Sequence, residues 1–217
     1  MITLPEAFEQ EMKQLLGEEE YEAYRKTFDE AVHRGLRVNN GKISTEEFLR
    51  RTDIPLKKVP WIPNGFYYDE ESCNPAKDAD YYAGLYYLQE PSAMTPASRL
   101  PIEPDDRVLD LCAAPGGKSL HAADKMRNQG CVEARDLTEY KVDLIRENVQ
   151  RAGVSCVVPK VKDAEQLDAE WIGKADVVIA DLPCTGYGVI GRKPDIKYYA
   201  SKEKEEELVR IQRAILA

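Results

Sequence analysis

The fold is decided by residues 108–118, which read Val-Leu-Asp-Leu-Cys-Ala-Ala-Pro-Gly-Gly-Lys. An apolar run typical of a buried strand ends there in a tight turn, and a helical pattern begins at Ser119. Gly116 and Gly117 allow positive φ and allow a ligand to approach the main chain closely. Backbone N–H groups at the start of the helix would face that ligand. Doubly wound α/β proteins hold nucleotide-like cofactors at such a turn, although this spacing matches neither the dinucleotide fingerprint nor the P-loop.

The patterns of apolar and polar residues along the whole chain predict two regions, with a boundary at residue 80. Residues 1–80 predict a smaller α+β domain, with a helix over 5–30, a short strand at 36–39 and strand-and-turn structure over 53–69. Residues 81–217 predict a Rossmann-like α/β domain with a parallel, doubly wound sheet, because strands and helices alternate. The strands are expected at 108–111, 131–135, 155–161 and 175–180, and the helices at 119–126, 139–152 and 202–216.

Capping residues predict where individual helices begin and end. Ser44 with Glu47 has the spacing of a capping box, so a helix is expected to start there. Ser92 is expected to open a short helix that leads into the second domain. Gly153 is expected to stop the amphipathic helix over residues 139–152.

Composition limits the class of protein. The 217 residues carry a net charge of −9, which argues against nucleic-acid binding through the whole surface but leaves local basic clusters at 33–37 and 192–197. Five cysteines without a C-x-x-C pair and only two histidines argue against a zinc site or a disulfide framework. We therefore expect no metal cofactor, no membrane span, no signal peptide and a cytoplasmic location.

Acidic residues occupy the ends of the four predicted strands, where ligands bind in such sheets: Asp110, Asp136, Asp163 and Asp181. Asp136 can accept hydrogen bonds from both hydroxyls of a ribose, and Asp163 from an exocyclic adenine amine. A single acid at a strand end is often only a helix cap or a turn former. Three in successive crossovers after a double-glycine turn favour a nucleoside cofactor.

Asp181 also opens a second motif, Asp-Leu-Pro-Cys-Thr-Gly-Tyr-Gly, at residues 181–188. Pro183 fixes φ and so presents Cys184 at a set angle. Most free cysteines are small buried apolar side chains. The position of Cys184 in a strand-end loop, close to an acid, favours a reactive thiol instead.

Two stretches, residues 112–118 and 181–197, closely resemble motifs of the bacterial Fmu/Sun-type (RsmB/RsmF-like) rRNA cytosine-5 methyltransferases. Residues 34–39 and 89–94 are similar to that family's N-terminal segment, so the resemblance covers nearly the whole chain. It implies an enzyme that uses S-adenosylmethionine and modifies RNA, with small-subunit ribosomal RNA as the expected partner. It also implies that residues 1–80 are an RNA-recognition segment.

The resemblance assigns a role to each motif residue. The turn would hold the methionine and ribose parts of the cofactor through Cys112, Ala113, Ala114, Pro115, Gly116, Gly117 and Lys118. Asp136 would bind the ribose, Asp163 the adenine side, and Asp181 would lie between the cofactor and the target cytosine. Cys184 would act in release of the product. The candidates for phosphate contacts are Arg34, Arg37, Arg192, Lys193 and Lys197.

The implied reaction needs a thiolate because carbon 5 of cytosine is a poor nucleophile. The thiolate adds to carbon 6, carbon 5 takes the methyl group, and loss of the carbon 5 proton with elimination of the thiolate completes the turnover. The target base must be single-stranded or flipped out. In the family, the attacking thiol belongs to a Thr-Cys motif on the strand after the helix near Leu216, and this sequence ends at Ala217. We therefore expect low activity, a sheet without its last three strands, and an edge strand open to self-association.

Two alternatives remain open at this point. The first is a non-catalytic module of the same fold that binds RNA or S-adenosylmethionine. The second is a different enzyme class, an exocyclic-amine methyltransferase or a nicotinamide dehydrogenase. An amine methyltransferase needs an aromatic residue where this sequence has Cys184, which argues against that class. The missing G-x-G-x-x-G motif argues against a nicotinamide dehydrogenase.

Overall fold

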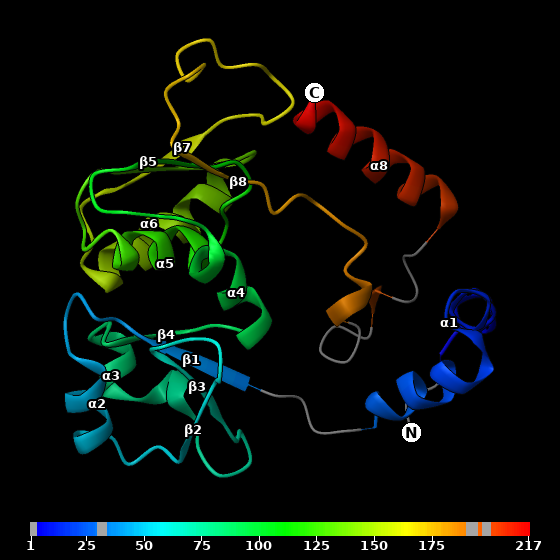
Figure 1. Ribbon diagram of the computed structural model, residues 1–217, viewed down its shortest axis with the longest axis horizontal. Coiled ribbons are helices and arrows are strands. Elements are labelled where there is room, and N and C mark those ends of the chain that lie inside the picture. The colour runs from blue at the N-terminus through cyan, green and yellow to red at the C-terminus, as the bar shows by residue number, and fades with distance from the viewer. Residues whose placement is uncertain (1–3, 30–33, 190–194, 197–200) are drawn as a thin grey trace. The chain divides into compact units, whose positions relative to one another are not determined.

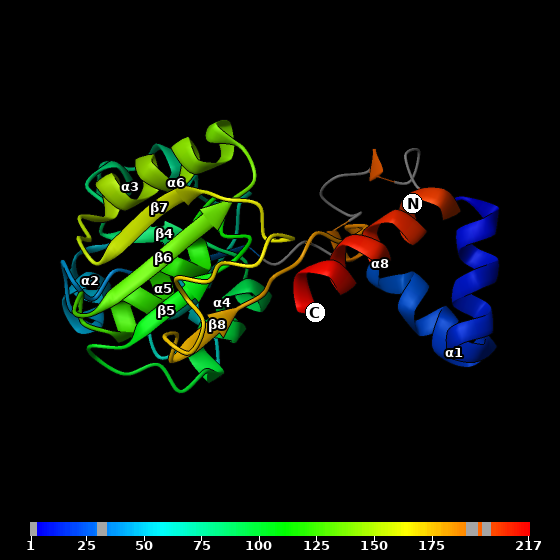
Figure 2. The ribbon, with the colours of Figure 1, turned by 90° about the horizontal axis from the view of Figure 1, so that it is seen from above.

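The computed structural model describes residues 4–29, 34–189, 195–196 and 201–217, and Figures 1 and 2 show its elements. The chain divides into two units. One comprises Met1–Val32 with Pro183–Arg213, and the other comprises His33–Leu182 with Ala214–Ala217. None of the described helices has the length and apolar character needed to cross a bilayer.

The larger unit contains the predicted parallel sheet. Its order is β7-β6-β5-β8, and all three strand pairs are parallel. The strands are β5 (Arg107–Asp110), β6 (Cys131–Asp136), β7 (Val157–Val161) and β8 (Val177–Ile179). Helices α5 (Gly117–Lys125) and α6 (Glu139–Ala152) pack on this sheet through a buried core that includes Val108, Ala122, Val132 and Ile145.

A second, antiparallel sheet precedes it in the chain, with the order β2-β3-β1-β4. Its strands are β1 (Arg34–Val38), β2 (Leu56–Lys58), β3 (Gly65–Tyr68) and β4 (Tyr86–Leu88). Its core includes Leu36, Phe48, Phe66 and Tyr86. Shorter helical elements surround it: α2 (Thr45–Arg51), η1 (Pro75–Lys77), α3 (Ala79–Tyr82) and α4 (Pro91–Arg99). Figure 1 shows α5 and α6 between this sheet and the parallel one.

The smaller unit is mainly helical. Helix α1 (Glu6–Thr27) is broken at Gly17, where φ is 79° and ψ is 166°. The 3-10 turn η2 (Tyr187–Val189) and helix α8 (Lys202–Leu216) supply the rest of its described structure. The Tyr187 ring packs edge-on against Phe8 with centroids 5.6 Å apart, and the Tyr187 hydroxyl donates to Glu205 Oε1 at 2.5 Å.

Most predicted elements are confirmed with small shifts at their ends. Ser44 caps α2 by accepting a hydrogen bond from the Glu47 N–H, and Gly153 ends α6 with φ at 70°. The short helix predicted at Ser92 is confirmed with a shift of one residue: α4 begins at Pro91 with Glu90 as its N-cap, because proline is favoured in the first helical turn. The domain boundary at residue 80 stays a prediction, and the antiparallel sheet extends beyond it to β4.

The predicted edge strand is β8, which pairs with β5 alone among the described strands. The side chain of Val178, in the middle of β8, is 49% exposed. An unpaired strand edge is a template for pairing with another chain. Self-association through β8 stays a prediction.

Candidate functional site

The sheet order brings the four predicted acids to one edge. Because parallel strands end on the same side, the carboxyl ends of the four strands are neighbours. Asp136 and Asp110 are the last residues of β6 and β5, and Asp163 and Asp181 come two residues after the ends of β7 and β8. The register supports this order: Asp136 pairs with Val161, and Asp110 pairs with Ile179. The prediction that these acids share one edge is therefore confirmed for the sheet.

The turn between β5 and α5 is held by hydrogen bonds from two neighbouring elements. The Ala113 N–H donates to the Arg135 carbonyl at 2.7 Å, and the Ala114 N–H donates to Asp136 Oδ2 at 3.0 Å. On the other side, Asn148 Nδ2 of α6 donates to the Pro115 carbonyl at 2.9 Å. The backbone of the turn is thus preorganised by β6 and α6. Asn148 had no sequence signal of its own, because an asparagine inside a helix is usually unremarkable.

The two glycines of the turn have different roles. Gly116 is the N-cap of α5 with φ at 105°, a region that L side chains rarely adopt, so this glycine is required by the backbone. Gly117 lacks the predicted positive φ. A Cβ there would lie 2.9 Å from Cε1 of Tyr87 and 3.2 Å from Nε2 of Gln89. Glycine at 117 therefore makes room for Tyr87 and Gln89, and the approach of a ligand to its backbone stays a prediction.

Asp136 is 5% exposed and uses both of its carboxylate oxygens. Oδ2 accepts from Ala114, whereas Oδ1 accepts from the Leu137 N–H at 2.8 Å and pairs with Lys141 Nζ at 2.9 Å. Each carboxylate oxygen has two acceptor directions, so the group retains capacity for a ligand hydroxyl. Asp136 thus joins the turn to the end of β6, as a ribose-binding acid would need to.

Cys112, the first residue of the predicted turn, is half-buried and free. Burial raises the pKa of its thiol to about 11, and the neighbouring carboxylates Asp136 and Asp110 add to the effect. The side chain is therefore a neutral thiol near pH 7, and only a thiolate is an effective nucleophile. This supports a packing or binding role for Cys112.

Asp110 ends β5 and is fully buried. Its Oδ2 accepts from the Ser119 hydroxyl at 2.6 Å, whereas its Oδ1 has no hydrogen-bond partner among the described residues. Burial raises the pKa of Asp110 to about 6, against the lowering effects of Ser119 and Lys118. A buried acceptor without a partner at this edge is a place where a bound donor would be favoured.

We expect Asp110→Asn to stabilise the protein above pH 6. Because the folded pKa of about 6 exceeds the ordinary 3.8, the folded state binds the proton more tightly, and stability falls as pH rises from about 4 to 6. The difference corresponds to about 3 kcal/mol at neutral pH. Thermal unfolding should show a gain for the variant at pH 5 and about twice that gain at pH 8. Asp143→Asn, an exposed acid, is the control, and equal pH profiles for D110N and the wild type would contradict the expectation.

Lys118 and Asp181 join the two sequence motifs. Lys118 Nζ, in the first turn of α5, donates to Asp181 Oδ2 at 2.5 Å. The side chain of Asp181 is 58% exposed, so the carboxylate can also be reached from solvent. The loop after β8 and the turn after β5 therefore meet, which places a charged pair beside the candidate cofactor turn.

The remaining predicted residues are placed as follows. Asp163 accepts from the Glu165 N–H at 2.9 Å and shapes the turn after β7. Cys184 is exposed and free, and it lies in the smaller unit, where the neighbouring Pro183 carbonyl accepts from Gln212 Nε2 of α8 at 2.7 Å. The exposure contradicts the alternative of a buried structural cysteine.

The predicted phosphate-binding residues have separate outcomes. Arg34 pairs with Glu70 at 2.5 Å and stays partly exposed. Arg37 is 2% exposed and bonds to Gln89 and Asp124, so burial argues against the expected phosphate contact. Arg192, Lys193 and Lys197 lie outside the described residues.

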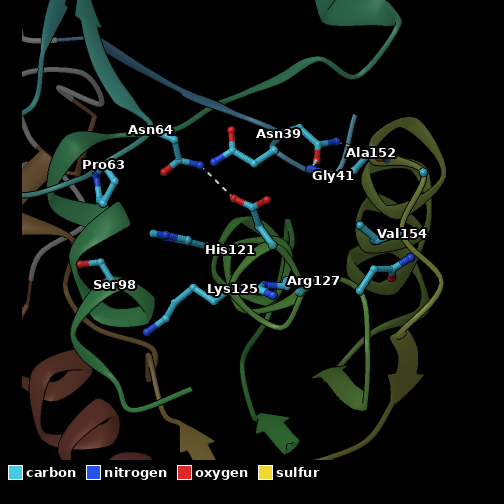
Figure 3. Close-up of a pocket in the computed structure, with 15 residues that line it drawn as sticks. Asn39, Gly41, Pro63, Asn64, Ser98, His121, Lys125, Arg127, Ala152 and Val154 are labelled. Atoms are coloured by element: carbon cyan, nitrogen blue, oxygen red, sulfur yellow. Dashed lines mark hydrogen bonds between the residues drawn. The ribbon is translucent and has the colours of Figure 1, made fainter. Parts of the chain in front are cut away.

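A cavity lies elsewhere, towards the opposite end of α5 (Figure 3). It has a volume of about 790 Å³, and its lining includes Asn39, Asn64, His121, Lys125 and Arg127. Burial lowers the pKa of His121 to about 2, with help from Arg37 and Lys125, so the imidazole is neutral at physiological pH. The residues of α5 that line this cavity lie in the second half of the helix, His121 to Lys125, away from the turn. The described residues contain no cluster of side chains that could hold a metal ion.

Comparison with known families agrees with both halves of the chain. Residues 4–91 match the N-terminal domain of the 16S rRNA methyltransferase RsmF, and residues 97–217 match the model for the 16S rRNA methyltransferases RsmB/F. The curated ribosomal RNA small subunit methyltransferase F of Citrobacter koseri is 31% identical over 99% of this chain. The match covers 47% of that protein, so the chain spans about half the length of such relatives.

Solved structures give the same picture. The crystal structure of PH0851 matches 98% of this chain and 49% of its own, with a TM-score of 0.88 and 29% identity. A methyltransferase homolog protein from Pyrococcus horikoshii matches 88% of this chain and 61% of its own, with a TM-score of 0.74 and 30% identity. The antiparallel sheet and the parallel sheet are therefore found together in known proteins.

Proposed function

Because this chain belongs to the RsmB/F family of 16S rRNA methyltransferases, we propose that it binds S-adenosylmethionine over the turn at residues 112–118 and serves in methylation of carbon 5 of a cytosine in small-subunit ribosomal RNA. The family membership supplies the class of reaction. The binding site, the target base and the RNA are the proposal. A ribosomal RNA substrate would place the protein in the cytoplasm.

The observation that carries the proposal is the joining of the two motifs at one sheet edge. The turn after β5 is fixed by Asp136 and Asn148, and the loop after β8 reaches it through the Lys118–Asp181 pair. Ligands of doubly wound sheets bind outside the carboxyl ends of the strands. A cofactor and a substrate base held there would lie side by side.

The residues present fit a sulfonium nucleoside. The first N–H groups of α5, after the Gly116 cap, are free of intrahelical partners and suit a ligand carboxylate. Asp136 has acceptor capacity for ribose hydroxyls, and Asp110 has a buried oxygen without a partner. Cys112 stays a neutral thiol and so does not compete for the methyl group. When bound, the cofactor supplies an electrophilic methyl group on a positively charged sulfur.

Asp181 is suited to hold the target base. Its exposed carboxylate can accept a hydrogen bond from the exocyclic amine of cytosine, and from nitrogen 3 once that atom takes up a proton as a thiolate adds to carbon 6. Lys118 Nζ keeps the Asp181 side chain in place between turn and base. Cys184, three residues further along and exposed, is proposed to act in release of the methylated base.

RNA would reach this edge as a single strand or a flipped base, because carbon 5 and carbon 6 are covered inside a helix. Arg34 is partly exposed and remains a candidate phosphate contact once its pairing with Glu70 is exchanged. Phosphate contacts by Arg192, Lys193 and Lys197 stay predictions. Arg37 is not proposed as a phosphate contact, because its side chain is buried. The acidic net charge of −9 confines such contacts to local surfaces.

Two measurements test the proposal. Calorimetry with S-adenosylhomocysteine should give saturable binding with one site per chain. The second measurement is incubation with small-subunit RNA and S-adenosylmethionine, followed by mass spectrometry of the nucleosides. Any methylated base that is detected should be 5-methylcytosine. An absence of binding overturns the cofactor site. Binding without any product supports a binding module in place of a methylating one, and another methylated nucleoside overturns the cytosine assignment.

A further inference from the structure

We propose that Gln89 and Arg37, from the antiparallel sheet, are positioning residues that fix the cofactor turn through Gly117. The idea rests on the proposed function, because it assumes that the turn binds S-adenosylmethionine. It gives the first sheet a direct part in cofactor binding, in addition to any part in RNA recognition. Three observations within the larger unit lead to it.

The first observation is the contact at Gly117. A Cβ on this residue would lie 2.9 Å from Tyr87, in the middle of β4, and 3.2 Å from Gln89, directly after β4. Real Cβ contacts are almost never as short as 2.9 Å and are rarely as short as 3.2 Å, so the side chains of Tyr87 and Gln89 occupy the space beside the turn. The start of α5 therefore cannot move toward the antiparallel sheet, and the position of its first N–H groups relative to that sheet is fixed.

The second observation is the way Gln89 is held. Its side chain is almost fully buried, its Oε1 accepts from Arg37 Nε at 3.1 Å, and its Nε2 donates to the Ala93 carbonyl at 3.0 Å. Both polar ends of the carboxamide are therefore satisfied in one orientation. A buried amide fixed at both ends is a rigid support for the backbone against which it packs.

The third observation is that Arg37 touches both ends of α5 through its partners. Its Nε bonds to Gln89, which packs on Gly117, and its Nη1 bonds to Asp124 near the other end of the helix at 3.2 Å. Asn64 also donates to Asp124 Oδ2, at 2.8 Å (Figure 3). Arg37 therefore fixes the position of the whole helix on the first sheet, and a guanidinium with several donors is suited to this.

The test uses Gln89→Met in the 217-residue chain. Methionine keeps the length and volume of the side chain but removes both bonds of the carboxamide, while Arg37 keeps its pairing with Asp124. Calorimetry with S-adenosylhomocysteine, without RNA, should show a dissociation constant about tenfold higher than for the wild type. Affinity for a single-stranded RNA probe, and its salt dependence, should stay unchanged.

Asn64→Leu is the matched control. Asn64 is buried like Gln89 and bonds to the same Arg37–Asp124 pair, but it lies at the far end of α5 from the turn. We expect a similar loss of thermal stability and a cofactor affinity within about twofold of the wild type. Equal affinities for Q89M and the wild type, or an equal loss in N64L, overturn the inference alone. No binding by the wild type overturns the proposed function and this inference together.

Discussion

Replacing Asp136 by alanine is expected to raise the dissociation constant for S-adenosylhomocysteine about a hundredfold, a loss of about 2.7 kcal/mol. Two effects combine. The ribose hydroxyls lose their acceptor, and the Ala114 N–H loses the carboxylate to which it donates at 3.0 Å. A buried donor left without a partner costs about 1–3 kcal/mol, so the turn itself is expected to shift. Calorimetry measures the effect, and circular dichroism checks that the variant is folded.

Lys141→Ala is the control for this variant. It removes the ion pair at 2.9 Å from Asp136 but leaves the carboxylate and its bond to the turn. Because the Lys141 side chain is 51% exposed, this pair contributes little, and the dissociation constant should change by less than about threefold. Asp136→Asn, which keeps an acceptor oxygen, should fall between the two. Wild-type affinity in the alanine variant would contradict the role given to Asp136.

Gly116→Val is expected to reduce cofactor affinity about a hundredfold while costing about 2 kcal/mol of stability. At φ 105° a β-branched residue is strained wherever it sits. The added Cβ would lie 3.4 Å from Cγ2 of Ile145, an ordinary contact, so the backbone strain at φ 105° is what is expected to move the cap of α5. The N–H groups that follow the cap would then no longer face the ligand.

Gly173→Val separates strain from binding. Gly173 also has positive φ, at 66°, but a Cβ there meets nothing within 4 Å. We expect a comparable loss of melting temperature and unchanged cofactor affinity, measured by thermal unfolding and by calorimetry. The role of Gly116 would be refuted if G173V lost affinity to the same degree, or if G116V bound normally.

Local patterns were enough to predict most of the parallel sheet and its helices. The period of apolar residues gives α6 with its exact bounds, and Gly153 ends it as expected because glycine adopts the left-handed conformation without cost. The acids after β5 and β6 could also be predicted as neighbours, since parallel strands present their carboxyl ends together. The start of α4 at Pro91 was missed, although the preference of proline for the first helical turn could have indicated it.

The surroundings of the turn could not be predicted in this way. Asn148 reaches Pro115 from 33 positions away, and Gln89 reaches Gly117 from another sheet. Arginine side chains are usually exposed, so the sequence indicates a surface position for Arg37. The burial of the Arg37 side chain against Gln89 and Asp124 is evident only from the folded structure. Such contacts depend on how two sheets pack against the helices between them, and a sequence period carries no information about that packing.

The amino-acid sequence by itself determined the family, the alternation that makes a parallel sheet, and the motif residues of the two strand-end loops. The family follows from the resemblance of the two motifs, whereas the sheet and the strand-end loops follow from local chemistry: periodicity, glycine conformation and the residue types that a nucleoside cofactor requires. Tertiary structure alone decided that Arg37 belongs to the interior, that Gly117 faces a neighbouring sheet, and that Lys118 meets Asp181. The physical reason is that burial and side-chain pairing depend on distances across the fold, which only the packed chain sets.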